Sequence, residues 1–221
     1  MAQWLDGTFF SFDAGIFNFM HNLALKAGGF FTPFFKVVSF FGEGGIFFIL
    51  LGVILLLFSK TRKSGLTVLI AILIGFLLTN VVIKNSVARL RPYQSSEEYR
   101  EFWGFVKSKD QSEYSFPSGH ATVTMASMTA LFFTCKKKWS WGFFLFSLLM
   151  CFARVYQIFH YATDVIGGLI VGGVAGTCAF FIVKAIYKAI EKNKEKAFCF
   201  FLLNADLYCW LKSKFKKDKT V

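Results

Sequence analysis

Residues 164–183 read DVIGGLIVGGVAGTCAFFIV. This stretch is twenty residues long, and its only charged residue is the aspartate at its start. An α-helix needs about 20 residues to cross the hydrocarbon core of a bilayer. We therefore predict that these residues form a transmembrane helix.

Further apolar blocks lie upstream, at residues 44–58, 65–83, 118–133 and 139–152. The N-terminal 43 residues hold two shorter apolar stretches that charged residues and Pro33 interrupt. Two arrangements stay open for these residues: one crossing preceded by an amphipathic helix at the membrane interface, or a segment that lies at the interface throughout. The predicted fold class is therefore all-α, a polytopic membrane bundle of about six transmembrane helices.

Composition supports a membrane protein and argues against nucleic-acid binding. Of the 221 residues, 55% are hydrophobic and 31 are phenylalanine, and the mean hydropathy is +0.53. The net charge of +12 gathers in short basic runs and in the C-terminal part. Such runs are typical of cytoplasmic connections and of contacts with anionic lipid headgroups. We expect the lipid bilayer as a partner, and no nucleic acid.

The basic runs also predict the orientation in a plasma membrane. Residues 60–63 and 136–138 are basic connections, which we expect on the cytoplasmic side together with the C-terminus. Counting crossings then places residues 84–117 and 154–160 on the extracytoplasmic side. The N-terminus lacks the basic region of a cleavable signal peptide, and we expect none.

Three parts are expected along the chain, without a linker between separate domains. Residues 1–43 form the first membrane segment, residues 44–186 the catalytic bundle, and residues 187–221 a basic cytoplasmic tail. An apolar stretch of the tail, residues 197–211, is expected to lie on the membrane surface.

Residues that carry chemistry gather in the two outer connections. Lys84 and Arg91 are seven positions apart, so they share one face if the helix continues between them. Pro92 is expected to divert the chain into the outer loop. Taken alone, these two cations are equally consistent with contacts to lipid headgroups.

Pro117-Ser118-Gly119-His120 opens the next helix. Ser118 is a favourable N-cap, and Gly119 allows another group to approach the backbone closely. The free N–H groups of a helix N-terminus attract anions, and His120 adds a titratable group in the first turn. An ordinary capped helix with an interfacial histidine explains this tetrapeptide equally well.

Arg154, His160 and Asp164 form the third element. His160 and Asp164 are spaced i, i+4, so both can lie on one helical face. A carboxylate bonded to Nδ1–H leaves Nε2 free as base or nucleophile. An aspartate near a membrane boundary is costly without a partner, which favours function over an interfacial ion pair.

These elements supply three cations, a helix N-terminus and two histidines, one of them beside a carboxylate. The set fits phosphoryl transfer without a metal, in which cations neutralise the phosphate oxygens while one histidine attacks phosphorus and the other protonates the leaving oxygen. The outer carboxylates have no histidine at ligand spacing. We expect neither a metal nor another cofactor.

The three elements read Lys84-NSVARL-Arg91-Pro92, Pro117-Ser118-Gly119-His120 and Arg154-VYQIF-His160-YAT-Asp164. In this order and spacing the chain resembles the type 2 phosphatidic acid phosphatase superfamily over about residues 40–185. The resemblance implies a six-helix membrane bundle and a phosphohistidine intermediate without a metal. It implies His160 as nucleophile, Asp164 as its orienting partner and His120 as general acid. The implied phosphate-binding residues are Lys84, Arg91, Ser118, Gly119 and Arg154.

One position departs from the family pattern, because Ala153 stands where a serine is expected before Arg154. The missing hydroxyl removes a hydrogen bond worth about 0.5–1.5 kcal/mol. We expect weaker phosphate binding with activity retained.

The expected substrate is a phosphorylated membrane lipid, with undecaprenyl diphosphate as first choice because the site is expected to face outward. Phosphatidylglycerol phosphate and phosphatidate are the other substrates that the resemblance implies. Two other functions stay open. One is a phosphotransferase that passes the phosphoryl group to a second hydroxyl substrate, and the other is a non-catalytic phospholipid-binding protein.

A ridge of small residues continues from the third element. His160, Asp164, Gly168, Gly172 and Gly176 follow one another at i+4 steps. Small residues at this spacing let helices approach closely in lipid. We expect this glycine ridge to pack the last helix tightly and so hold His160 in place.

Overall fold

The computed structural model of this protein describes residues 1–106, 110–111, 113–136, 140–196, 204–207 and 212. The regular elements of this part are all helices, which confirms the predicted fold class. In chain order they are α1 (Ala2–Thr8), α2 (Phe10–Lys26), α3 (Thr32–Phe40), the 3₁₀ turn η1 (Glu43–Gly45), α4 (Ile46–Leu56), α5 (Arg62–Phe76), the π-helical segment η2 (Leu77–Ile83), α6 (Lys84–Val87), α7 (Pro92–Ser95), α8 (Glu97–Phe105), α9 (Gly119–Thr134), α11 (Gly142–Tyr156) and α12 (Ala162–Lys192).

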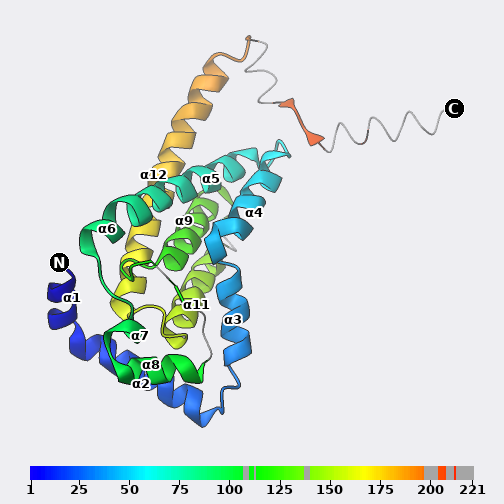
Figure 1. The fold of residues 1–221 in the computed structure, drawn as a ribbon. Helices are drawn as coiled ribbons and strands as arrows, with labels where there is room; N and C mark the ends of the chain where they lie inside the picture. Colours follow the sequence, from blue (N-terminus) through cyan, green and yellow to red (C-terminus); the bar gives the residue numbers. More distant parts are fainter. Residues whose placement is uncertain (107–109, 112, 137–139, 197–203, 208–211, 213–221) are drawn as a thin grey trace.

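Helix α9 lies inside the bundle, where it packs against α5, α11 and α12 (Figure 1). Its buried side chains are mostly small, among them Ala121, Ala126 and Ala130. Small side chains allow close approach of several helices at once in a membrane, where packing replaces the hydrophobic effect as the driving force. Helices α7 and α8 and the N-terminal helices α1 and α2 lie together at one end of the bundle (Figure 1).

In the part of the chain that the structure describes, three helical stretches are long and apolar enough to span a membrane, namely Thr32–Leu56, Arg62–Ser95 and Ala162–Lys192. Helix α11 is a shorter apolar helix. Large apolar side chains such as Leu50 and Ile170 are exposed on the spanning stretches, as expected for helices that face lipid. The chain is a multi-pass membrane protein, while the number of six crossings remains a prediction.

The first candidate span runs across the boundary expected at residue 43. Helix α3, η1 and α4 follow one another with a bend at Gly44 and Gly45, where φ is 56° and 70°. These left-handed conformations suit glycine, which lacks Cβ. The division of the chain into three parts remains a prediction.

Lys84 and Arg91 do not share a helix, so the condition for a shared helical face is not met. Helix α6 ends at Val87, and Ala88 adopts a left-handed conformation with φ of 52°. The chain then reaches Arg91 in an extended conformation, and Pro92 begins α7 as its first residue. The two cations therefore approach the site from different segments.

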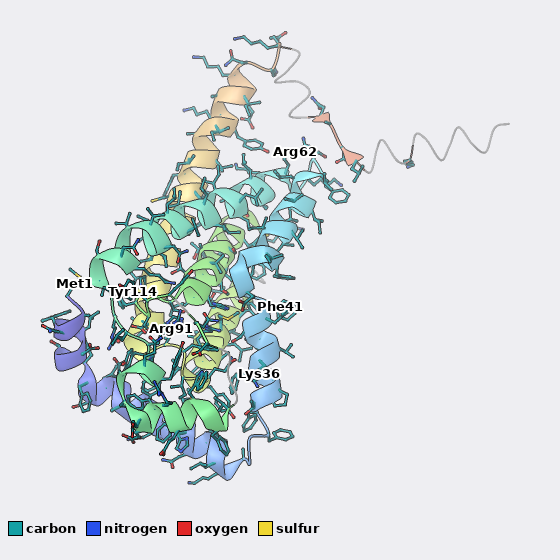
Figure 2. The ribbon with its side chains drawn as sticks, in the orientation of Figure 1. Met1, Lys36, Phe41, Arg62, Arg91 and Tyr114 are labelled. Carbon is teal, nitrogen blue, oxygen red and sulfur yellow. The ribbon has the colours of Figure 1, made fainter. Side chains whose placement is uncertain are left out.

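The described part of the tail contacts the turn between α4 and α5. The backbone N–H of Ser59 donates to Asp206 Oδ2 at 2.7 Å, and Leu207 N donates to Leu57 O at 3.1 Å. This turn also carries Arg62, which lies toward the end of the bundle away from Arg91 (Figure 2). The basic connection at residues 137–138 and most of the apolar stretch 197–211 lie outside the described residues.

The glycine ridge of α12 packs directly on the backbone of α9. A Cβ added at Gly168 would lie 2.7 Å from the carbonyl oxygen of Ser118, and one at Gly172 would lie 2.5 Å from that of Thr122. Gly176 makes the same approach to Ala126, at 2.7 Å. The helix that follows His160 is thus fixed against the helix that carries His120.

We expect Gly172→Leu to lower phosphatase activity about tenfold or more, although Gly172 lies outside the catalytic residues. The added side chain must push α12 away from α9, and overpacking of this kind typically costs about 1–3 kcal/mol. The matched control is Gly173→Leu, because a Cβ at Gly173 meets only the Met125 side chain at 3.8 Å. Turnover and the thermal midpoint of the purified proteins test this. Equal turnover by both variants would contradict a role for the ridge.

Candidate active site

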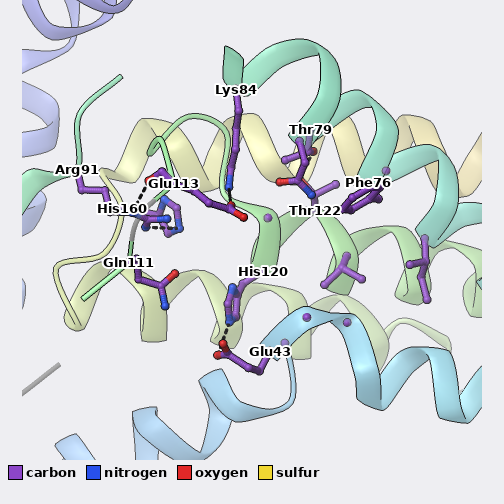
Figure 3. A pocket seen from close by; sticks show the side chains of 18 of the residues that line it. Glu43, Phe76, Thr79, Lys84, Arg91, Gln111, Glu113, His120, Thr122 and His160 are labelled. Carbon is purple, nitrogen blue, oxygen red and sulfur yellow. Dashed lines mark hydrogen bonds and ion pairs between the residues drawn. The ribbon is translucent and has the colours of Figure 1, made fainter. Parts of the chain in front are cut away.

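A cavity of about 430 Å³ opens beside the N-terminus of α9 (Figure 3). Five of the predicted site residues contribute to its wall: Lys84, Arg91, Gly119, His120 and His160. Ser118, Arg154 and Asp164 are buried but do not line it. The five lining residues form the polar part of the cavity, and Ile72, Phe76 and Val123 form an apolar part.

His160 lies in the connection between α11 and α12 and is 1% exposed. Its Nδ1 is 3.4 Å from Ser115 Oγ and 3.6 Å from Asp164 Oδ2. Its Nε2, on the other edge of the ring, is 3.4 Å from Arg91 Nη1. Burial and the charges of Arg91 and Arg154 hold the pKa of His160 well below its ordinary value. The imidazole is therefore neutral at physiological pH, with a lone pair available for attack.

Asp164 and His160 are close, but they do not share a helix, which the i, i+4 spacing had allowed. Helix α12 begins only at Ala162, and Asp164 is its third residue. There Asp164 Oδ2 accepts the backbone N–H of Tyr161 at 2.9 Å and the hydroxyl of Ser115. Ser115 stands between Asp164 and His160 and contacts both.

Arg89 is the ionic partner of Asp164. Its Nη1 donates to Asp164 Oδ1 at 2.7 Å, and both side chains are buried. Sequence reasoning missed Arg89, although it stands two residues before Arg91 in the same motif. Its contact could not be read from spacing, because it depends on the reversal of the chain at Ala88.

Two of the three predicted cations, Arg91 and Lys84, line the cavity, and Arg154 is buried without lining it. Arg91 Nε donates to the carbonyl of Glu113 at 2.8 Å, and Arg91 Nη1 to that of Phe159 at 3.0 Å. Lys84 Nζ forms an ion pair with the Glu113 carboxylate. This bond lowers the pKa of Glu113, which stays ionised at neutral pH.

Arg154 is fully buried, and its guanidinium lies 4.1 Å from the centre of the Phe159 ring. Its Nε and Nη2 have no hydrogen-bond partner among the described residues. A buried charged donor without a partner is costly. Two free donors on Arg154, beside the cations Arg91 and Lys84, are what an incoming phosphate needs.

The predicted N-cap is confirmed, since Ser118 Oγ accepts the N–H of Ala121 at 3.4 Å. The backbone N–H of Ser118 itself donates to Asp164 O at 3.0 Å. Its contact with phosphate therefore remains a prediction, as does that of Gly119. The next residue, His120, directs Nε2 toward Glu43 Oε2 at 3.4 Å (Figure 3).

Glu43, Glu113 and Ser115 were not among the predicted site residues. Glu43 belongs to η1, far from the motifs in sequence, and only the fold brings it to His120. Ser115 lies two residues before the second motif, which begins at Pro117, so the motif itself does not include it. Among the described residues, no group of three His, Cys, Asp or Glu side chains is placed to hold a metal ion.

Fold and site together define a polytopic helical membrane protein with a buried histidine at a cationic cavity. Residues 64–191 match the family model described as the PAP2 superfamily. The chain belongs to this superfamily, which confirms the resemblance seen in its three motifs.

Curated relatives support the same family. The chain is 32% identical over 120 residues to an undecaprenyl-diphosphatase of Sulfolobus acidocaldarius, and the match covers 54% of this chain and 55% of that protein. It is 26% identical over 119 residues to a lipid A 4'-phosphatase of Bacteroides thetaiotaomicron, which covers 52% of each chain. The match spans about half the length of these two relatives.

A solved structure shares the fold. The crystal structure of Aquifex aeolicus LpxE superimposes with a TM-score of 0.62 at 22% sequence identity. The match covers 75% of this chain and 93% of that chain.

Proposed function

We propose that this protein is a metal-independent lipid phosphatase that forms a phosphohistidine intermediate on His160. The observation that carries the proposal is the setting of the imidazole. Its Nδ1 faces Ser115 and Asp164, and its Nε2 faces Arg91 at the wall of the cavity. When Nδ1–H donates toward Ser115 and Asp164, the lone pair of Nε2 is free to act as a nucleophile.

In the first step, Nε2 of His160 attacks phosphorus and the bond from phosphorus to the leaving oxygen breaks. His120 donates its proton to that oxygen, so the leaving oxygen departs as a hydroxyl group of the lipid product. Lys84, Arg91 and Arg154 stabilise the charge on the remaining phosphate oxygens. Lys84 can bind phosphate only if the phosphate replaces Glu113, whose carboxylate forms an ion pair with the Lys84 ammonium group.

In the second step, water attacks the phosphorus of phosphohistidine and the P–N bond breaks. His120, now neutral, accepts the proton of the attacking water, and phosphate leaves. Each histidine thereby returns to its starting protonation state. The pair Asp164 and Ser115 keeps the Nδ1 side of His160 fixed through both steps.

The substrate that we propose first is undecaprenyl diphosphate. The name of the Sulfolobus acidocaldarius relative supports this choice. The cavity supports an anionic headgroup joined to an apolar chain, because its cationic end continues into a part lined by Ile72, Phe76 and Val123. These features apply to other phosphorylated membrane lipids as well, so the choice requires a direct comparison of substrates.

The proposed site faces the extracytoplasmic side of the plasma membrane, with the C-terminus in the cytoplasm. Support comes from the basic turn at residues 60–63, which lies toward the end of the bundle away from Arg91 (Figure 2). Positive residues favour the cytoplasmic side of membrane helices.

The test is phosphate release by purified protein in detergent, with and without EDTA. The panel contains undecaprenyl diphosphate, phosphatidylglycerol phosphate, phosphatidate and lipid A. We expect release from at least one lipid, and the same rate within about twofold after chelation, because histidine and fixed cations supply what a metal otherwise would. Release that depends on an added hydroxyl acceptor would indicate a phosphotransferase. Absence of release from every lipid would contradict the proposal.

A further inference from the structure

A second acidic residue, Asp13, is buried beside the catalytic aspartate. Asp13 lies in the first turn of α2 and is 3% exposed. Its Oδ1 accepts the backbone N–H of Thr163 at 2.9 Å, and its Oδ2 accepts the Thr163 hydroxyl at 2.7 Å. Thr163 is the second residue of α12 and precedes Asp164. A carboxylate from the N-terminal segment thus supplies the N-cap contact of the helix that carries the catalytic aspartate.

Arg89 joins the two carboxylates. Its Nη2 donates to Asp13 at 3.0 Å, and its Nη1 donates to both Asp164 and the Thr163 hydroxyl at 2.7 Å. Its guanidinium also lies 3.7 Å from the centre of the Tyr161 ring. Arg89 is 1% exposed, so water does not compete for these contacts. The remaining donor, Nε, binds Asp6 at 2.7 Å, so the guanidinium contacts five neighbours and Asp13 holds its Nη2 side.

We propose that Asp13 is a positioning residue that sets the orientation of His160 through Arg89, Thr163 and Asp164. The inference rests on the proposed function, because it concerns the same nucleophile. Asp164 has two oxygens with separate tasks: Oδ1 binds Arg89, and Oδ2 faces Ser115 and Nδ1 of His160. A shift of Arg89 or of the first turn of α12 therefore rotates the oxygen that orients the imidazole.

Asp13 contacts both groups that hold Asp164 in place, namely Arg89 and the first turn of α12. Without its charge, Arg89 keeps Asp164 as its only fully buried carboxylate, since the third partner, Asp6, has a side chain that is 50% exposed. Removing one member of a buried charged network leaves the others uncompensated. Asp13→Asn also replaces one of the two oxygens that accept the N–H and the hydroxyl of Thr163 in the first turn of α12. Neither change touches the cavity, because Asp13, Arg89 and Thr163 are absent from its wall.

The test compares kcat and KM of the native protein with those of Asp13→Asn, on whichever lipid of the panel the native protein hydrolyses. We expect kcat to fall about 10- to 100-fold, because a nucleophile displaced by about 1 Å reacts far more slowly. We expect KM to stay within about twofold, because the phosphate-binding cations are unchanged. The matched variant Asp6→Asn makes the same chemical change on the same partner at an exposed position. It should lower kcat by less than about threefold.

Thr163→Val is the second variant, because it keeps every charge and nearly the same volume. It removes the hydroxyl between Asp13 and Arg89 and should lower kcat about three- to tenfold at unchanged KM. It decides the question if Asp13→Asn does not fold. Native kcat in both variants, or a loss that appears only as a raised KM, would overturn the positioning role while leaving the phosphatase proposal intact. A native protein inactive on every lipid would overturn both.

Discussion

His160→Ala is expected to abolish lipid phosphate release, with kcat lowered by about 10⁴-fold or more. The phosphoryl group is transferred to the His160 imidazole, and the cavity wall offers no equivalent nucleophile at the same place. The cations Arg91 and Arg154 remain in the variant, so lipid should still bind. The expected outcome is therefore a protein that retains its substrate and does not turn it over.

Trapping the intermediate gives the decisive measurement. Native protein quenched in alkali during turnover of a ³²P-labelled lipid should carry acid-labile phosphate, and the alanine variant should carry none. His21→Ala is the matched control, since His21 stacks on Phe102 with ring centroids 3.5 Å apart and does not line the cavity. Labelled phosphate on the His160→Ala protein would assign the nucleophile to another residue.

The membrane fold was predictable because lipid imposes a simple rule on sequence. A helix that crosses the hydrocarbon core must be apolar along its length, so the block at 164–183 identified α12 without any tertiary information. The bend at Gly44 and Gly45 was not predictable in the same way. Two helices joined by a bend show the same hydropathy as one interrupted helix, so α3 and α4 were placed on different sides of an expected boundary.

The site residues were predictable where they belong to a motif of fixed spacing. Their partners were not predictable where only the fold brings them into contact. Lys84, Arg91, His120 and His160 meet at one cavity as the motifs implied. Helix periodicity, however, allowed Lys84 with Arg91 and His160 with Asp164 on shared helices, and neither pair shares one because the backbone leaves the helix at Ala88 and α12 begins only at Ala162. Partners such as Arg89 then come from the irregular segments themselves.

The partners from the N-terminal segment could not be found from sequence. Asp13 and Glu43 stand outside the three motifs, in a segment whose pattern indicated only membrane contact. Their role depends on α2 and η1 lying against the end of the bundle where α12 and α9 begin. A lone acidic residue in an apolar stretch was the available signal, because such a residue is costly in lipid unless it has a partner.

His120→Asn is expected to lower the rate of phosphoenzyme formation from a phosphomonoester lipid that the native protein hydrolyses by about 10²- to 10⁴-fold, the usual contribution of a general acid. The alkoxide of the lipid is a poor leaving group, and protonation by His120 is what makes its departure fast. An activated aryl phosphate needs no such proton, because its phenolate leaves unaided. With p-nitrophenyl phosphate, the variant should therefore keep a rapid burst of about one equivalent of nitrophenolate, followed by slow turnover.

The slow turnover after the burst has its own cause, since His120 must also accept the proton of the water that hydrolyses phosphohistidine. Rapid-quench measurement of both substrates separates the two steps. His21→Asn is the matched control and should leave both rates within about twofold of native, because its ring packs on α8 away from the cavity. If the burst with the aryl substrate slows as much as the lipid reaction, His120 acts in binding phosphate and the general acid must be sought elsewhere. A retained burst assigns the proton to His120.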